Sequence, residues 1–436
     1  MLFFADLHLH SHYSRAVSEK MSLEGLAAAA RVKGLRILGT GDFSHPSWFS
    51  ELKTKLTPSD FEGFYVLKSE ASEKERGATL FLITNEVATI HSTPRGVKKV
   101  HHVVHAPSLE AAAQINDVYA RLGSLSADGR PTFGETSCAA FAELTFEACR
   151  EAVIVPAHAW TPWFGVFGSQ SGFDSLDEAY EDQAKKIFAI ETGMSSDPAM
   201  NWRLSALDRV ALLSNSDSHS PYPWRLGREC NAFEFEEKEL SYANLFKAVR
   251  EKNEKHFRFT VEVDPAYGKY HWDGHRTCGF SSPPSETRKL KGICPVCRRP
   301  LTIGVENRVE QLADRPAGFK PPHAIPFRTV LPLHELLAAV YASTLASRRV
   351  NEVGSRLIAE CGSELAVLLD APPEKLRRAA DEKIVALVLA NREGALRVRP
   401  GFDGEYGVLQ LTAREREEGV KAARKQRTLD DYGLIE

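Results

Sequence analysis

Apolar runs and amphipathic helical stretches alternate through the first 250 residues, and this alternation restricts the chain to a small set of folds. Residues 22–33, for example, have the features of a helix that begins at Ser22 and stops at Gly34. Strands that alternate with helices predict a parallel sheet, either open or closed into a barrel. The predicted strands are residues 2–5, 37–40, 79–85, 100–105, 153–156, 187–190 and 210–215, and the other predicted helices are 109–122, 139–151, 176–185 and 201–209.

At least one His, Asp or Glu lies at the end of every predicted strand. Asp6-Leu7-His8-Leu9-His10 follows the first strand, and side chains two positions apart leave the same face, where both can reach one metal ion. Seven such strand ends in succession predict a polynuclear metal site, because buried charges are costly unless they are paired or bound to metal. The strand-end residues are His8, His10, Asp42, His45, Glu86, His101, His102, His105, His158, Glu191, Asp217 and His219.

The donor types at these strand ends favour a hydrolytic metal centre. Imidazole nitrogens and carboxylate oxygens suit Zn²⁺, Mn²⁺ or Fe²⁺. Two or more such ions activate water and stabilise the oxygens of a phosphoryl displacement. The reaction that we expect is therefore hydrolysis of a phosphoester.

The composition is that of an ordinary globular protein, with 43% apolar and 26% charged residues. No apolar stretch has the length of a membrane span, and the N-terminus lacks the features of a signal peptide. Seven cysteines, an odd number, favour a reducing cytoplasm over a disulfide scaffold. The length of 436 residues predicts several domains, which we place at residues 1–255, 256–330 and 331–436.

A second candidate metal site lies in the middle domain. A His-x2-Cys motif precedes a Cys-x2-Cys motif, which is the ligand count and spacing of a tetrahedral structural zinc. The predicted ligands are His275, Cys278, Cys294 and Cys297, with His271 as an alternative to His275. Residues 276–330 hold ten Lys or Arg against four Asp or Glu, which predicts a polyanionic partner or, alternatively, a solvated basic surface. The basic residues near the motif are Arg288, Lys289, Lys291, Arg298 and Arg299.

An aromatic loop follows His158 and runs to residue 173. Rings next to amide and hydroxyl groups predict a pocket that stacks a flat base and hydrogen-bonds its edge. The alternative is that the rings pack into the rim of the fold. The residues expected to hold a base are Trp160, Trp163, Phe164, Phe167 and Ser171.

A proline-rich connector leads to a last region with helical apolar spacing and a charged tail. The tail segment from Gln426 to Tyr432 resembles a peptide that binds a sliding clamp, with an unstructured tail as the alternative.

The ordered set of strand-end motifs resembles the polymerase-and-histidinol-phosphatase (PHP) superfamily over about the first 250 residues. This resemblance implies a distorted seven-stranded (β/α) barrel with two or three divalent ions (Zn, Mn, Fe or Mg). Glu86 would be the bridging carboxylate, and Asp42 and His45 are alternatives at the second strand, as are His101 and His102 at the fourth. The implied ligands are His8, His10, Asp42, His45, Glu86, His101, His102, His158, Asp217 and His219, of which Glu86, Asp217 and His219 are expected to be catalytic.

The barrel motifs, the aromatic loop, the Cys/His motifs and the helical end together resemble the endonuclease Q family over nearly the whole chain. The resemblance implies a DNA-repair endonuclease that cuts 5′ to uracil, hypoxanthine, xanthine or an abasic site. The loop would hold the damaged base, and the basic zinc module would grip the duplex. Damaged DNA is then the expected partner, and the nucleoid within the cytoplasm the expected location.

Two alternative functions come from other classes. A small-molecule phosphatase of the histidinol-phosphate type would explain the barrel but not the zinc module. A weakly catalytic protein that binds DNA or a sliding clamp would explain the basic segment but not an intact set of metal ligands.

Overall fold

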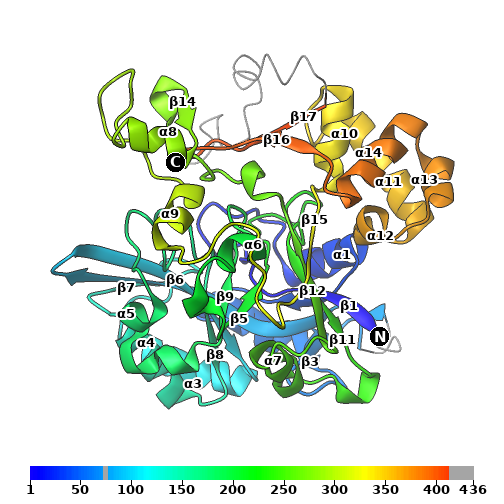
Figure 1. The fold of residues 1–436 in the computed structure, drawn as a ribbon. Coiled ribbons are helices and arrows are strands. Elements are labelled where there is room, and N and C mark those ends of the chain that lie inside the picture. Colours follow the sequence, from blue (N-terminus) through cyan, green and yellow to red (C-terminus); the bar gives the residue numbers. More distant parts are fainter. Residues whose placement is uncertain (72–76, 412–436) are drawn as a thin grey trace.

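The structure is a computed structural model that describes residues 1–71 and 77–411, and most of its strands belong to one mixed sheet (Figure 1). Eight strands of this 11-stranded sheet follow the order β15-β12-β11-β1-β2-β5-β4-β3, and β6, β7 and β8 join through β5 and β6. The strands are β1 (Leu2–Asp6), β2 (Leu35–Gly39), β3 (Leu56–Pro58), β4 (Tyr65–Leu67), β5 (Leu80–Thr93), β6 (Gly96–Ala106), β7 (Thr132–Gly134), β8 (Val153–Pro156), β11 (Cys230–Glu234), β12 (Phe257–Glu262) and β15 (Phe327–Thr329). A separate parallel pair consists of β9 (Ala189–Glu191) and β10 (Ala211–Leu213).

The prediction of a parallel sheet is wrong for several neighbouring strands. β1 pairs in parallel with β2, and β2 with β5, but the pairs β1–β11, β11–β12, β5–β6 and β6–β8 are antiparallel. β5 continues to Thr93 and turns back through two residues into β6, and so short a connection permits only an antiparallel pair. Among the described residues, the segments that follow β1 and β10 meet at one isolated bridge, between Leu9 and Ser218, and not in a continuous strand ladder. The closed seven-stranded barrel therefore stays a prediction.

Two hydrophobic cores lie on the two sides of these strands. One core takes side chains from β1, β2, β5, β6, β8, β9 and β10 and is covered by Leu245 and Val249 of α7. The other core packs α1, α3 and α4 against the opposite faces of the strands. The helix that begins at Ser22 is confirmed, because the Ser22 side chain accepts from the N–H of Gly25 and Gly34 ends the helix at φ 94°. The helices are α1 (Leu23–Lys33), α2 (Pro46–Lys55), α3 (Leu109–Tyr119), α4 (Cys138–Ala148), α5 (Leu176–Tyr180), α6 (Pro198–Asn201) and α7 (Tyr242–Arg250).

The helix predicted over residues 201–209 is wrong. Only α6 and a short 3-10 turn, Ser205–Leu207, occur there. The Asn201 amide donates to the carbonyl of Asp197, and the N–H of Ser205 donates to Asp314. These local bonds compete with the continuous backbone ladder that a helix requires.

The remaining elements lie together on one side of the main sheet (Figure 1). β13 and β14 form a small antiparallel hairpin, and five helices form a separate bundle that contacts α1 through the buried ion pair between Lys33 and Glu364. None of the described helices has the length and apolarity that crossing a membrane requires. These elements are β13 (Asp273–His275), β14 (Phe280–Ser282), α8 (Pro284–Lys289), α9 (Val305–Leu312), α10 (Leu333–Tyr341), α11 (Arg348–Cys361), α12 (Glu364–Leu369), α13 (Pro373–Ala379), α14 (Glu382–Arg392), β16 (Arg397–Arg399) and β17 (Val408–Gln410).

Candidate metal centres

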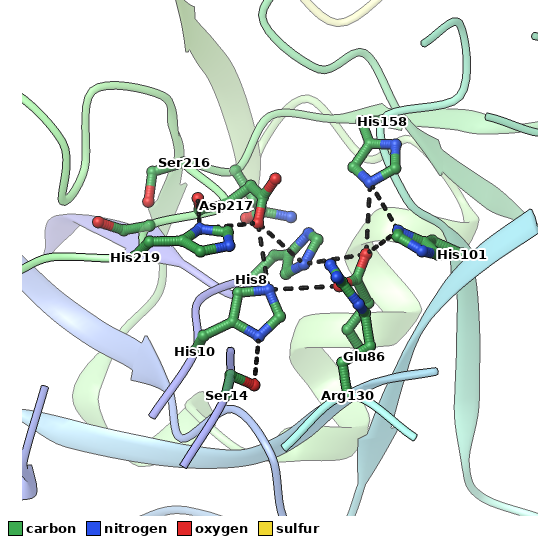
Figure 2. A network of polar contacts seen from close by, with 12 residues as sticks. His8, His10, Ser14, Glu86, His101, Arg130, His158, Ser216, Asp217 and His219 are labelled. Atoms are coloured by element: carbon green, nitrogen blue, oxygen red, sulfur yellow. Dashed lines mark hydrogen bonds and ion pairs between the residues drawn. The ribbon is translucent and has the colours of Figure 1, made fainter. Parts of the chain in front are cut away.

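Six strand-end side chains converge in one buried group, which we call the histidine–carboxylate cluster (Figure 2). Their donor atoms fall into two sets, each with all atoms within 4.8 Å of one another. The first set combines His8, His10 and Asp217, and the second combines Glu86, His101 and His158.

Glu86 lies between the two sets of the cluster. Its Oε1 is 2.8 Å from His101 Nδ1 and 3.7 Å from His8 Nε2, while its Oε2 is 3.2 Å from His10 Nε2. His10 Nε2 is also 3.2 Å from Asp217 Oδ1. A single carboxylate that reaches both sets has the position of a bridging ligand.

The cluster passes a simple test for metal binding. His8 Nε2, His10 Nε2, Glu86 Oε1 and Asp217 Oδ1 are buried, and none of them makes a hydrogen bond of good geometry, although ion-pair contacts of 2.8–3.7 Å involve all four. Buried polar atoms without a partner cost about 1–3 kcal/mol each, so convergence of four of them needs a compensating group. Nitrogen and carboxylate oxygen donors are the ligands that Zn²⁺ and Mn²⁺ take. The residues therefore fit divalent ions.

In three of the four cluster imidazoles, the second ring nitrogen has a partner that sets the ring orientation. His8 Nδ1 lies 3.0 and 3.1 Å from the two carboxylate oxygens of Glu191, and His10 Nδ1 lies 3.1 Å from Asp42 Oδ1. His158 Nδ1 lies 2.9 Å from the Thr161 hydroxyl. Such outer partners fix the tautomer and raise the basicity of a ligating imidazole. Asp42 thus lies behind His10 rather than within either set of candidate ligands.

Alternation along β6 separates the two adjacent histidines of that strand. His101 and Glu86 are diagonal neighbours on one face of the hairpin, because Glu86 pairs with Val103. His102 points to the opposite face, where its nitrogens lie 2.7 Å from the Tyr180 hydroxyl and 2.9 Å from the Thr89 hydroxyl. Burial lowers the pKa of His102 to about 3. The prediction of His102 as a ligand is therefore wrong.

His45, the alternative to Asp42 at the second strand, does not join the cluster either. Its ring stacks on Tyr13 with centroids 4.5 Å apart, and burial lowers its pKa. His219 lies at the margin, because its ring centroid is 4.6 Å from that of His10 but its nitrogens belong to neither set of donors. His105, another strand-end residue, is buried beside Phe246 in the core.

Burial and charge act against each other on the ionisable groups of the cluster. Burial lowers the pKa of His8, but the carboxylates of Glu191 and Glu86 outweigh it and raise that pKa well above the ordinary value. Burial raises the pKa of Glu86, but His101, Arg130 and His8 bring it well below the ordinary value. The carboxylate of Glu86 is thus held ionised, as a metal ligand requires.

Three residues around the cluster have left-handed backbone conformations that are rare for side chains other than glycine. The φ angles are 50° at Asp42, 30° at His158 and 47° at Asp217. Each such conformation costs on the order of 1–3 kcal/mol and tends to persist where it aims a functional side chain. All three lie in the turns that follow β2, β8 and β10.

The aromatic loop after β8 contains both buried and exposed rings. Trp160 and Phe167 are each only 1% exposed and pack against each other, so the prediction that they contact a base is wrong. Ser171 is also buried, and its hydroxyl accepts from the N–H of Phe164. Phe164 packs on His101 of the cluster with centroids 4.3 Å apart, and the neighbouring Trp163, which is 42% exposed, lies with its centroid 6.0 Å from that of Tyr270.

The four predicted zinc ligands of the middle domain also meet, and we call them the Cys/His site. Donor atoms of His275, Cys278, Cys294 and Cys297 all lie within 4.8 Å of one another, with His275 Nδ1 3.3 Å from Cys297 Sγ. The alternative ligand His271 lies instead 3.8 Å from Glu306. Three sulfurs and one imidazole nitrogen have the composition of a structural zinc site.

The five basic residues near the Cys/His site are all exposed. Two of them have acidic partners, because Arg288 pairs with Glu310 and Lys289 pairs with Glu286, each at 2.7 Å. The tail segment that resembles a clamp-binding peptide, residues 426–432, lies outside the described residues.

Sequence reasoning missed three residues of this region. Glu191 was recognised as a strand-end acid but not as the partner of His8, and Thr161 was not recognised as the partner of His158. Arg130, which donates to Glu86, follows no predicted strand and carries no motif. Only the folded chain brings these side chains to the cluster.

The fold and the cluster define a mixed α/β protein with a buried histidine–carboxylate centre. PfuEndoQ, a lesion-specific endonuclease from Pyrococcus furiosus, is 32% identical to the chain, with a TM-score of 0.81 over 100% of both chains. The chain therefore belongs to the endonuclease Q family. Endonuclease Q in complex with a 27-mer duplex substrate with an abasic lesion at the active site is 31% identical, with a TM-score of 0.82 over 99% of this chain and 100% of that one.

Two further similarities were found: the helical end of the chain matches a protein family, and the chain is similar to part of a longer protein. Residues 332–395, which contain α10 to α14, match the family described as MJ0043 C-terminal domain. The uncharacterized protein MJ0043 of Methanocaldococcus jannaschii is 29% identical over 283 residues, which are 63% of this chain and 34% of that protein. The chain thus spans about a third of the length of that relative.

Proposed function

We propose that this chain is a metal-dependent DNA-repair endonuclease that hydrolyses the phosphodiester bond 5′ to deaminated bases (uracil, hypoxanthine or xanthine) or abasic sites. The observation that carries the proposal is the buried cluster of donors without hydrogen-bond partners, in a chain that matches lesion endonucleases along its whole length. The hydrolysis consumes one water: its oxygen bonds to phosphorus, one ester P–O bond breaks, and the departing oxygen takes up a proton.

The cluster residues would hold two or three divalent ions (Zn, Mn or Mg). His8, His10 and Asp217 would supply one set of ligands, and Glu86, His101 and His158 would supply the other, with Glu86 as the carboxylate that reaches both. Bound ions would supply Lewis-acid activation of water and stabilise the phosphoryl oxygens. Asp42 and Glu191 orient the imidazoles of His10 and His8, and His219 lies close enough to Asp217 to act beside it.

The rest of the chain would bind the damaged duplex. Trp163 and Phe164 are the rings that remain available to stack an extruded base beside the cluster. The Cys/His site, with one structural zinc, would fold a module that presents Arg288, Lys289, Lys291, Arg298 and Arg299 to the phosphate backbone. We place the cluster in residues 1–255, this module in 256–330 and the helical end in 331–436.

End-labelled duplexes with and without one deoxyuridine or abasic site test this function. We expect a single cut 5′ to the lesion in Mg²⁺ or Mn²⁺, no cut in chelator and no cut in the undamaged duplex. Release of phosphate from small phosphomonoesters with no cut in any lesion duplex would contradict the proposal and favour the small-molecule phosphatase.

A further inference from the structure

Arg130 is a cation that lies against the histidine–carboxylate cluster. Its NH1 group donates to Glu86 Oε2 at 3.1 Å, while 30% of its side chain stays exposed. Figure 2 shows the guanidinium next to Glu86 at the edge of the cluster. Arg130 therefore combines contact with a candidate bridging ligand and access from solvent.

The backbone holds Arg130 in place from two directions. On one side, the N–H of Gly129 donates to the carbonyl of Tyr13 at 3.1 Å, and the N–H of Arg15 donates to Asp128 at 3.1 Å. On the other side, the carbonyl of Pro131 accepts from the N–H of Ala88 at 2.9 Å, and β7 then pairs with β5. The guanidinium is thus presented from a fixed segment.

Gly129 makes this close approach possible. A Cβ atom at this position would collide with the side chains of Asp42 and Ser14. The segment that carries Arg130 therefore packs directly on the carboxylate that orients His10. A larger residue at position 129 would displace the Arg130 backbone from the cluster.

The guanidinium has more donors than Glu86 uses. It carries five N–H groups in a planar fork that matches two oxygens of a phosphate. Among the described residues, the guanidinium makes an ion pair with Glu86, and this pair uses one of its nitrogens. With 30% of the side chain exposed beside the cluster, the remaining N–H groups are available to an anionic ligand.

We propose that Arg130 is a catalytic residue that donates hydrogen bonds to a non-bridging oxygen of the scissile phosphodiester. The inference rests on the proposed function and adds a phosphate-binding residue to it. Arg130 keeps its proton throughout and stabilises negative charge that develops on the phosphoryl oxygens. The competing role is structural, in which Arg130 only balances the charge of buried Glu86.

Two substrates and two variants separate these roles. Arg130→Gln and Arg130→Lys are compared on an abasic duplex and on bis(4-nitrophenyl) phosphate, a phosphodiester without a base or a duplex. We expect Arg130→Gln to lower kcat/KM by about 10²-fold or more on both substrates. Arg130→Lys should restore part of the loss, because it keeps the charge but not the fork. Arg121→Gln is the matched control, with the same charge change at an exposed position outside the cluster, and should stay within about threefold on the small diester.

Metal content provides a readout independent of turnover. Mass spectrometry of the purified variants should give the same number of bound metals as the wild type, and the melting temperatures should agree. Loss of metal in step with loss of activity would assign Arg130 the structural role. The proposal would also be overturned if kcat/KM of Arg130→Gln were unchanged. It would equally be overturned if kcat/KM fell on the abasic duplex but not on the small diester.

The same assays distinguish failure of the Arg130 proposal from failure of the proposed endonuclease function. If the wild type leaves lesion duplexes intact but hydrolyses the small diester, the endonuclease proposal fails and the Arg130 comparison is still decided on the diester. If the wild type hydrolyses neither substrate, the role of Arg130 is tested by calorimetry, which measures the binding of inorganic phosphate. Arg130→Gln should then weaken phosphate binding to the metal-loaded protein at least about tenfold, and equal binding would refute the proposal.

Discussion

The two candidate metal centres of this chain are built in opposite ways. The histidine–carboxylate cluster gathers residues from sequence positions as far apart as His8 and Asp217, and its orientation depends on further buried partners. The Cys/His site closes between His275 and Cys297 around one short hairpin. A distributed site takes its geometry from a fold with its own core, whereas a local site supplies the fold of a small module. Removal of one candidate ligand should therefore impair the chemistry of the histidine–carboxylate cluster, whereas at the Cys/His site it should impair the folding of the local module.

The largest expected effect is at the bridging position of the cluster. Glu86→Gln replaces the charged carboxylate of the proposed bridging ligand with a neutral amide of the same shape, so lesion cleavage should fall by about 10³-fold or more. Metal content should fall as well, while circular dichroism and the zinc of the Cys/His site stay unchanged. Glu143→Gln, an exposed change on α4, is the control and should behave as the wild type. Normal metal content together with normal cleavage would show that Glu86 is not a ligand.

The Cys/His site should respond in the reverse manner. Cys294→Ser removes the buried sulfur of a proposed zinc ligand, so we expect loss of one zinc and weaker duplex binding by roughly tenfold, because the module presents several exposed cations. Hydrolysis of a small phosphodiester should be retained. Cys361→Ser is the matched control, because that thiol is free and lies in the helical bundle. Loss of small-diester hydrolysis in Cys294→Ser would mean that the two centres are not independent.

A smaller effect is expected from the two carboxylates that orient cluster imidazoles, those of Asp42 at His10 and Glu191 at His8. Asp42→Asn keeps the size of the side chain but removes the charge next to His10 Nδ1, so metal affinity or activity should fall about 10- to 100-fold. Glu191→Gln should act similarly through His8. Asp117→Asn on the exposed face of α3 is the control. If Asp42→Asn were as damaging as Glu86→Gln, Asp42 would be a direct ligand, as the sequence left open.

The sequence predicted which residues meet better than it predicted how they meet. Spacing of two after an apolar run is a local signal, and it pointed to His8, His10 and Asp217, whose donor atoms do converge, although His219 does not join them. The His-x2-Cys and Cys-x2-Cys motifs are a second local signal, and the four residues of the Cys/His site converge as well. Near-identical neighbours such as His101 and His102 cannot be separated without the strand register, because a shift of one residue exchanges the two faces.

Partners from distant segments were beyond sequence reasoning for a similar reason. Arg130 reaches Glu86 only because Gly129 permits close packing on Asp42 and Ser14. In the aromatic loop, Trp160 and Trp163 are equally suitable for a base pocket by residue type. Burial of the first and exposure of the second follow from how the loop folds over the core.

The smallest expected effect concerns the acidic groups beneath the cluster rather than the cluster itself. Glu262 is fully buried, and burial raises its pKa from 4.5 to about 8, although hydroxyls of Thr260, Thr192 and Ser214 counteract the shift. The unfolded chain ionises this group near pH 4.5, whereas the folded chain must retain the proton. The stability that the protonated group contributes is therefore fully present below pH 4.5, and it is lost as the pH rises towards 8.

Glu262→Gln removes this titration while keeping an oxygen that can accept from the same hydroxyls. The free energy of unfolding should then depend less on pH between 5 and 8 than in the wild type, where the pKa of Glu262 is about 8. Some dependence should remain, because burial also raises the pKa of neighbouring Glu229. Urea unfolding at several pH values measures the slope, with the exposed change Glu254→Gln as the control. Parallel slopes for Glu262→Gln and the wild type would show that Glu262 is already ionised in the folded chain, and that the charge beneath the cluster is neutralised by another group.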